Sequence, residues 1–172
     1  MKTLVIHPKD RTTDMLCAVY QDMNCTTVRN HVSKSELKRL ISSHDRIIMM
    51  GHGTALGLFG FGGYVINSDL VYLLREKKET VYIWCNADEF VKKYDLKGLY
   101  SGMIISEKEE AEYCNVECSY KDVNISNNYF SDALTECVAK GYSLAIFHDN
   151  YIDEDDDNPV MAYNRERMFY KK

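Results

Sequence analysis

A histidine and a cysteine are the side chains in this sequence best suited to covalent chemistry. His52 lies between two glycines in the segment MMGHG, and Cys85 lies in the segment VYIWCNADEF. A cysteine nucleophile reacts as a thiolate, so it needs a neighbouring base or cation. Histidine is the usual base, because the pKa of its imidazole lies near neutral pH. The two residues therefore predict acyl transfer, with Cys85 as nucleophile and His52 as base, if the fold brings them together.

The elements that would position this pair follow the pattern of a parallel sheet wound with helices. Apolar, β-branched runs predict strands, and apolar residues at helical spacing predict the helices between them. Strands are expected at 2–7, 25–30, 45–53, 80–85 and 98–106, and helices at 11–23, 33–44, 67–79, 88–96, 107–114 and 126–141. The segment 142–152 fits a helix or a strand. The predicted fold class is α/β, a three-layer sandwich with a mostly parallel central sheet.

Both reactive residues are expected at the carboxyl edge of this sheet, where functional groups collect in such folds. His52 directly follows one apolar strand, and Cys85 ends the next strand along the chain. Paired strands lie about 4.8 Å apart, so the two side chains can approach each other if these strands are neighbours. The run LGLFGFGGYVI predicts a tight hairpin beside the site, with Gly60, Gly62 and Gly63 in the turn.

Groups next to the pair are candidates for binding a substrate. The N–H of Gly53 and the N–H of Cys85 would form an oxyanion hole. Asn86, Asp88 and Ser106 follow strands at the same edge and would stand where a substrate lies. For Asn86 and Asp88 the alternative is capping and first-turn acidity of the helix at 88–96. For Ser106 the alternative is capping of the helix at 107–114.

The run IIMMGHGTALGLFGFGGYVINSDLVYLLREKKETVYIWCNADEF resembles the catalytic stretch of caspase-like cysteine peptidases. That clan also includes metacaspases, gingipains, clostripain and the bacterial CHAT domains. The shared order is strand, His-Gly, glycine-rich hairpin, helix, strand, Cys, and it covers about residues 45–90. The resemblance implies a caspase-like fold in which His52 and Cys85 form the catalytic dyad and Gly53 donates to the oxyanion. It also implies a peptide or protein substrate and no metal or organic cofactor.

Length and composition bound the other possibilities. The 172 residues fit one domain over 1–172, and 45% of them are apolar. A net charge of −5 argues against a nucleic-acid partner. No segment has the roughly 20 apolar residues that span a bilayer, and the start of the chain does not resemble a signal peptide. We therefore expect a cytoplasmic protein without a membrane partner, whose six cysteines are thiols.

A second class of function stays open at this stage. A catalytically inactive caspase-like or Rossmann-like module would use the same crevice to hold or sequester a small anionic or nucleotide-derived ligand, or to bind a protein partner. Helix starts that point into a strand-end crevice suit anions. The chain has no Walker lysine and no G-x-G-x-x-G after its first strand, which disfavours generic nucleotide hydrolysis and dinucleotide chemistry. The acidic run at 153–158 is expected to be a solvated loop.

Overall fold

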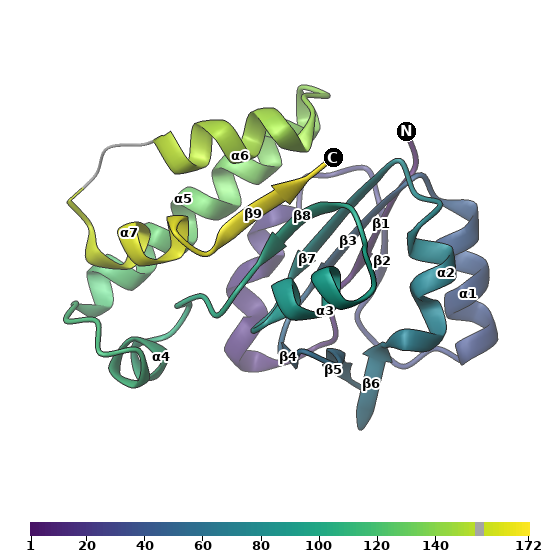
Figure 1. Cartoon of the computed structure of the whole chain (residues 1–172), viewed down its shortest axis with the longest axis horizontal. Helices are drawn as coiled ribbons and strands as arrows, with labels where there is room; N and C mark the ends of the chain where they lie inside the picture. Colours follow the sequence, from purple (N-terminus) through teal and green to yellow (C-terminus); the bar gives the residue numbers. More distant parts are fainter. Residues whose placement is uncertain (154–156) are drawn as a thin grey trace.

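A six-stranded sheet forms the centre of the computed structural model, which describes residues 1–153 and 157–172 (Figure 1). The strand order is β2-β1-β3-β7-β8-β9, and only the last pairing, between β8 and β9, is antiparallel. The strands are β1 (Thr3–Ile6), β2 (Thr26–Val28), β3 (Arg46–Met50), β7 (Glu79–Ile83), β8 (Gly98–Ser101) and β9 (Met168–Lys171). Part of the acidic run predicted as a loop, residues 154–156, lies outside the described residues.

The central strands are apolar on both faces, as their sequence predicts. Every residue of β1 and of β3 is buried. Alternate residues of a strand point to opposite faces, and here they enter different cores. Leu4 and Ile47 join one hydrophobic cluster, whereas Val5 and Ile48 join another. The sheet therefore needs a layer of helices on each side.

The two helical layers supply that cover (Figure 1). On one face lie α1 (Lys34–Ser43), α2 (Val71–Leu74) and α3 (Ala87–Lys93), and on the other lie the 3₁₀ helix η1 (Arg11–Val19), α5 (Tyr120–Ala139) and α6 (Leu144–Asp153). The remaining helices are η2 (Ser68–Leu70), α4 (Lys108–Tyr113) and α7 (Pro159–Arg165). The chain is thus an α/β protein with a mixed, mostly parallel sheet between two layers of helices, and this part of the prediction is confirmed.

The glycine-rich segment forms a small antiparallel sheet next to the main one. It consists of β4 (Gly53–Thr54), β5 (Gly57–Gly60) and β6 (Gly63–Ile66). Gly60 pairs with Gly63, and the two residues between them, Phe61 and Gly62, have φ values of 56° and 85°. Two positive φ angles in a two-residue turn match the twist of a hairpin. The predicted hairpin and its turn are confirmed.

Several predicted boundaries differ from those in the structure. The strand predicted at 98–106 ends at Ser101, one residue before the N–H of Gly102 makes a last bond to the carbonyl of Arg167, which directly precedes β9. The helix predicted at 126–141 begins at Tyr120, where Ser119 and Asp122 form a capping box. The helix predicted at 67–79 ends at Leu74, and the helix predicted at 11–23 is a 3₁₀ helix that ends at Val19.

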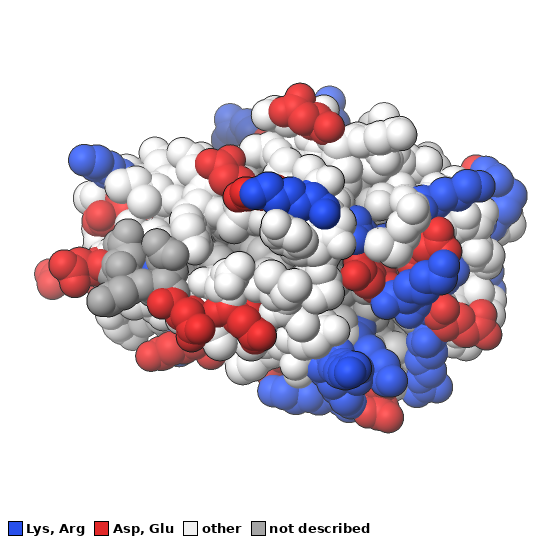
Figure 2. All heavy atoms as spheres, turned by 90° about the horizontal axis from the view of Figure 1, so that it is seen from above, with Lys and Arg blue, Asp and Glu red and all other residues white. Residues whose placement is uncertain are grey.

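The C-terminal part of the chain contains two elements that the sequence did not specify. The ambiguous segment 142–152 is helical from Leu144 onward and belongs to α6. Strand β9 was not predicted, and it joins the sheet edge beside β8. Among the described residues, no helix has the length and apolar character needed to cross a membrane. On the face seen in Figure 2, acidic and basic side chains are interspersed, with wide uncharged areas between them.

Candidate functional site

His52 and Cys85 leave the ends of neighbouring strands at the same level. Strands β3 and β7 pair in parallel, with Met50 opposite Ile83. The N–H of Gly51 then donates to the carbonyl of Ile83 at 3.0 Å, which continues the pairing one residue further. The two strands are therefore neighbours, which is the condition for the side chains to approach each other. The sheet therefore brings the candidate base and the candidate nucleophile to one edge.

A cavity at this edge contains both residues. Its volume is about 40 Å³, enough for only a few water-sized groups. His52, Cys85 and Ser106 are the sequence-predicted site residues in its lining, whereas Gly53, Asn86 and Asp88 are not part of it. The polar side chains that share the lining are Thr13, Glu110, Ser126, Asn127, Tyr151 and Asn164. Among the described residues, no lysine or arginine lines this cavity.

An open groove borders the cavity on the side of the hairpin. It is lined by Pro8, Lys9, Asp10, His52 and residues 59–63, and its volume is about 390 Å³. His52 belongs to both the groove and the cavity. The groove is large enough for a side chain or a short extended segment, while the cavity is not. A peptide-sized molecule would therefore lie in the groove and present one group toward the cavity.

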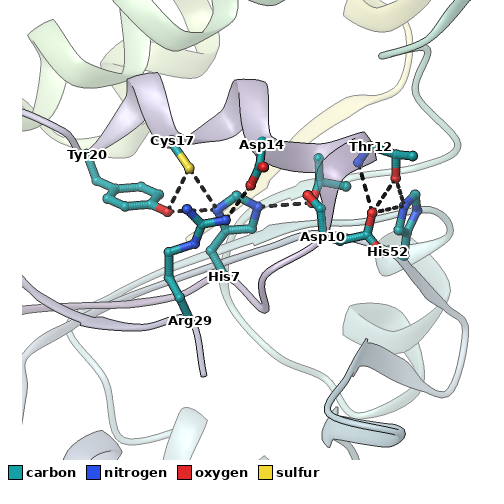
Figure 3. Close-up of polar contacts among 9 residues, drawn as sticks. His7, Asp10, Thr12, Asp14, Cys17, Tyr20, Arg29 and His52 are labelled. Carbon is teal, nitrogen blue, oxygen red and sulfur yellow. Dashed lines mark hydrogen bonds and ion pairs between the residues drawn. The ribbon is translucent and has the colours of Figure 1, made fainter. Parts of the chain in front are cut away.

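The imidazole of His52 is held from the start of η1 (Figure 3). Its Nε2 lies 2.6 Å from the hydroxyl of Thr12 and 3.9 Å from a carboxylate oxygen of Asp10. The side chain of His52 is 42% exposed. Among the hydrogen bonds of the described residues, none joins His52 to Cys85. The two residues thus share a cavity without forming a preassembled pair.

The thiol of Cys85 is half-buried and neutral in the free protein. Burial raises its pKa to about 11, and electrostatic interactions with Glu110 and then with Cys114 act in the same direction. A thiol with this pKa is almost fully protonated at pH 7. Any attack by Cys85 at neutral pH therefore needs its proton to be removed during the reaction, by a base in the same cavity.

Gly53 lies against the indole of Trp84, the residue that directly precedes Cys85. The indole N–H of Trp84 donates to the carbonyl of Thr54 at 3.0 Å, so this side chain fixes β4 beside the end of β7. The carbonyl of His52 accepts from the N–H of Phe59 at 2.8 Å. Hydrogen-bonded and non-hydrogen-bonded pairs alternate in an antiparallel ladder, so Gly53 faces Leu58 in a non-hydrogen-bonded pair. Its N–H points away from β5 and is not used in that ladder.

The other predicted binding residues have local partners. Asn86 occupies the N-cap position of α3, as the capping alternative predicts, but with a left-handed backbone, φ 62°, and without a side-chain capping hydrogen bond. Asp88 pairs with Lys92 at 2.7 Å within α3, as a first-turn acid. The hydroxyl of Ser106 donates to Glu110 at 2.8 Å just before α4. Of these three, only Ser106 reaches the cavity.

Two asparagines from distant helices hold the cavity wall. Asn164 of α7 accepts from the N–H of Ile105 at 2.7 Å and donates to the carbonyl of the same residue at 2.8 Å. Asn127 of α5 donates to the carbonyl of Ser106 at 2.9 Å. The sequence reasoning missed these residues, as it missed Glu110 and Thr12. The helix-start signal at 11–14 was visible in the sequence, but nothing local linked Thr12 to His52.

A second histidine at the same edge is structural. His7 is fully buried, and its ring nitrogens lie 2.9 Å from the hydroxyl of Tyr20 and 3.1 Å from that of Thr13 (Figure 3). Burial lowers its pKa to about 4, and the positive charge of Arg29 adds to the effect. A base with both nitrogens engaged and so low a pKa does not compete with His52 for the role of catalytic base.

Comparisons of the chain with models of protein families, with curated proteins and with solved structures give no match. Within residues 1–153 and 157–172, no group of three or more histidine, cysteine or acidic side chains is arranged to hold a metal ion. The six cysteines are free thiols.

Proposed function

We propose that this chain is a caspase-like cysteine peptidase in which His52 and Cys85 perform acyl transfer on a peptide substrate. The observation that carries the proposal is the pairing of β3 with β7, which brings both residues to one cavity. The order strand, His-Gly, glycine-rich hairpin, helix, strand, Cys, on which the resemblance rests, is also the order of β3, residues 51–53, the β4–β6 sheet, α2, β7 and Cys85.

The proposed reaction uses general base catalysis from a neutral thiol. His52 removes the proton of Cys85 as its sulfur attacks the substrate carbonyl carbon, and the N–H groups of Gly53 and Cys85 receive the oxyanion. The C–N bond then breaks, and His52 gives its proton to the leaving amine. Water attacks the resulting thioester while His52 accepts its proton. The C–S bond breaks, and the proton returns to the sulfur of Cys85.

The groove beside His52 would bind the peptide. Its backbone would lie between the chain after β1 and the hairpin, where Lys9, Asp10 and Phe59 are available to side chains of the substrate. The described residues that line the cavity include the acidic Glu110 but no lysine or arginine. This arrangement favours neutral or basic substrate groups and gives less support to an anionic or nucleotide-derived ligand. The proposal requires a reducing compartment such as the cytoplasm, because Cys85 must stay reduced.

One observation favours a second candidate function, a non-catalytic caspase-like module that binds a protein partner. Burial holds the pKa of Cys85 at about 11, and a peptidase without a preformed thiolate depends entirely on His52. In a binding module the same thiol would be an unreactive group that lines the cavity. The two candidates differ in one property, namely whether Cys85 forms a covalent bond with a peptide carbonyl or with an electrophile that mimics it.

A peptide library read by mass spectrometry tests the proposal. The wild-type chain is expected to produce cleavage products that Cys85→Ala and His52→Ala do not produce. Cys118→Ala is the matched control, because Cys118 is a half-buried thiol outside the cavity, and it should cleave like wild type. Peptidyl acyloxymethyl ketones should label Cys85 in the wild type and not in His52→Ala. Equal cleavage by Cys85→Ala, or a folded protein that neither cleaves nor is labelled, would reject the peptidase and leave the binding module.

A further inference from the structure

We propose that Thr12 and Asp10 are positioning residues that fix the tautomer of His52, with the proton on Nε2 and the lone pair on Nδ1. The tautomer follows from the hydrogen-bond geometry alone. The use of Nδ1 as the base that accepts the proton of Cys85 rests on the proposed function.

The protons available to three side chains determine this tautomer (Figure 3). The hydroxyl oxygen of Thr12 lies 2.7 Å from a carboxylate oxygen of Asp10 and 2.6 Å from Nε2 of His52. An ionised carboxylate only accepts hydrogen bonds, and a hydroxyl has a single proton to donate. The proton of Thr12 therefore goes to Asp10, and its oxygen accepts from His52. The nitrogen that donates is Nε2.

The state of Asp10 supports this direction. Hydrogen bonds from the hydroxyl and then from the backbone N–H of Thr12 lower the pKa of the Asp10 carboxyl, so this group is ionised at neutral pH. A neutral imidazole carries one N–H. With that proton on Nε2, Nδ1 keeps an unshared pair and is the nitrogen that can take a proton. Asp10, 3.9 Å from Nε2, also lies where it stabilises the imidazolium that forms.

The fold holds the three residues in this relation. Asp10 is the N-cap of η1 and accepts the N–H of Thr12 at 2.9 Å, which fixes Thr12 relative to the carboxylate. The N–H of Lys9 donates to the carbonyl of Arg29 at 2.9 Å, which ties the segment after β1 to the segment after β2. Strands β1 and β3 pair in parallel, so η1, which follows β1, lies next to His52, which follows β3. The strand order of the sheet therefore produces the contact between Thr12 and His52.

Nitrogen NMR of the imidazoles tests the tautomer without any peptidase activity. In ¹⁵N-labelled wild type at a pH where His52 is neutral, its long-range ¹H–¹⁵N pattern should be that of the Nε2–H form. Thr12→Val should produce a mixture of both tautomers, and Thr12→Ser should restore the wild-type pattern. Thr12 is exposed, so these variants should fold. Thr27→Val, at an exposed position on β2, is the control and should leave His52 unchanged.

A predominant Nδ1–H form in the wild type, or a pattern that Thr12→Val does not alter, would overturn the inference. If the chain cleaves peptides, Thr12→Val should lower kcat by about tenfold, a part of what general base catalysis contributes, while Thr12→Ser should recover most of it. If the tautomer responds to Thr12 but no cleavage occurs in any variant, the positioning is supported and the peptidase proposal fails. The two proposals therefore have separate readouts.

Discussion

The backbone of Gly53 lies so close to the indole of Trp84 that no other residue fits there without rearrangement. A Cβ atom at position 53 would lie 2.3 Å from Cδ1 of Trp84 and 2.6 Å from the carbonyl oxygen of Gly57. Trp84 is fully buried and immediately precedes Cys85. The glycine after His52 therefore has a packing reason, whatever its N–H contributes to a reaction.

Gly53→Ala is expected to destabilise the chain by about 1–3 kcal/mol, the usual cost of overpacking a rigid contact. Gly63→Ala is the matched control within the same small sheet, because a Cβ there would meet nothing within 4 Å. Urea denaturation of both variants measures the difference in the free energy of unfolding. If Gly53→Ala is as stable as Gly63→Ala, Trp84 moves more freely than its contacts indicate.

The thiol of Cys85 should react slowly at neutral pH and faster as the pH rises. Because burial holds its pKa at about 11, iodoacetamide labelling of Cys85 should still be increasing above pH 9. Glu110→Gln removes the largest single charge that disfavours the thiolate, so it should lower the pKa and speed labelling at pH 8 by about twofold or more. Glu112→Gln, an exposed change on the same helix, should have little effect. Peptide mapping after timed labelling gives the rates, and a plateau near pH 7 would contradict the expectation.

Burial of His7 makes the stability of the fold sensitive to acid. Its pKa is about 4 in the folded chain and about 6.5 in an unfolded chain, so between these values the unfolded state binds a proton that the folded state does not. The contribution of His7 is therefore complete above pH 6.5 and is lost as the pH falls to 4, by at most about 3 kcal/mol.

Unfolding free energies of wild type and His7→Gln at pH 7 and pH 4.5 test this pH dependence. Glutamine keeps polar groups near Tyr20 and Thr13 but does not titrate. The loss of stability between the two pH values should be smaller in His7→Gln than in wild type, although its stability at pH 7 is expected to be lower. Equal losses in the two proteins would show that His7 is accessible to protons in the folded state.

Asn164 should matter more for stability than Asn127, although both line the cavity. Asn164→Ala removes both partners of the buried backbone of Ile105, and an unsatisfied buried group costs about 1–3 kcal/mol. The expected loss is about 2–4 kcal/mol. Asn127→Ala removes one bond to a part-buried carbonyl and should cost about 1 kcal/mol. Thermal and urea denaturation give the ranking, and the reverse order would show that the bond to Asn164 is not what holds this wall.

The sequence determined the layered architecture because each strand carries its own apolar pattern. Ile47–Met50 is apolar at every position, and such a strand has to be buried on both faces. The hairpin at 60–63 was equally local, since a two-residue turn with positive φ selects glycine and a few other residues. The same local patterns indicated that His52 and Cys85 stand at strand ends.

The tertiary structure alone decided what surrounds the two residues. His52 is held by Thr12 at the start of a different element, the thiol of Cys85 is buried near Glu110, and the cavity wall is fixed by Asn164 from the penultimate element. None of these contacts has a signature in local spacing, because each joins segments far apart in the chain. Strand order brings them together, and burial then sets the pKa of Cys85. The sequence thus indicated the two candidate residues, and only the fold determined their hydrogen-bond partners and the burial that raises the pKa of Cys85.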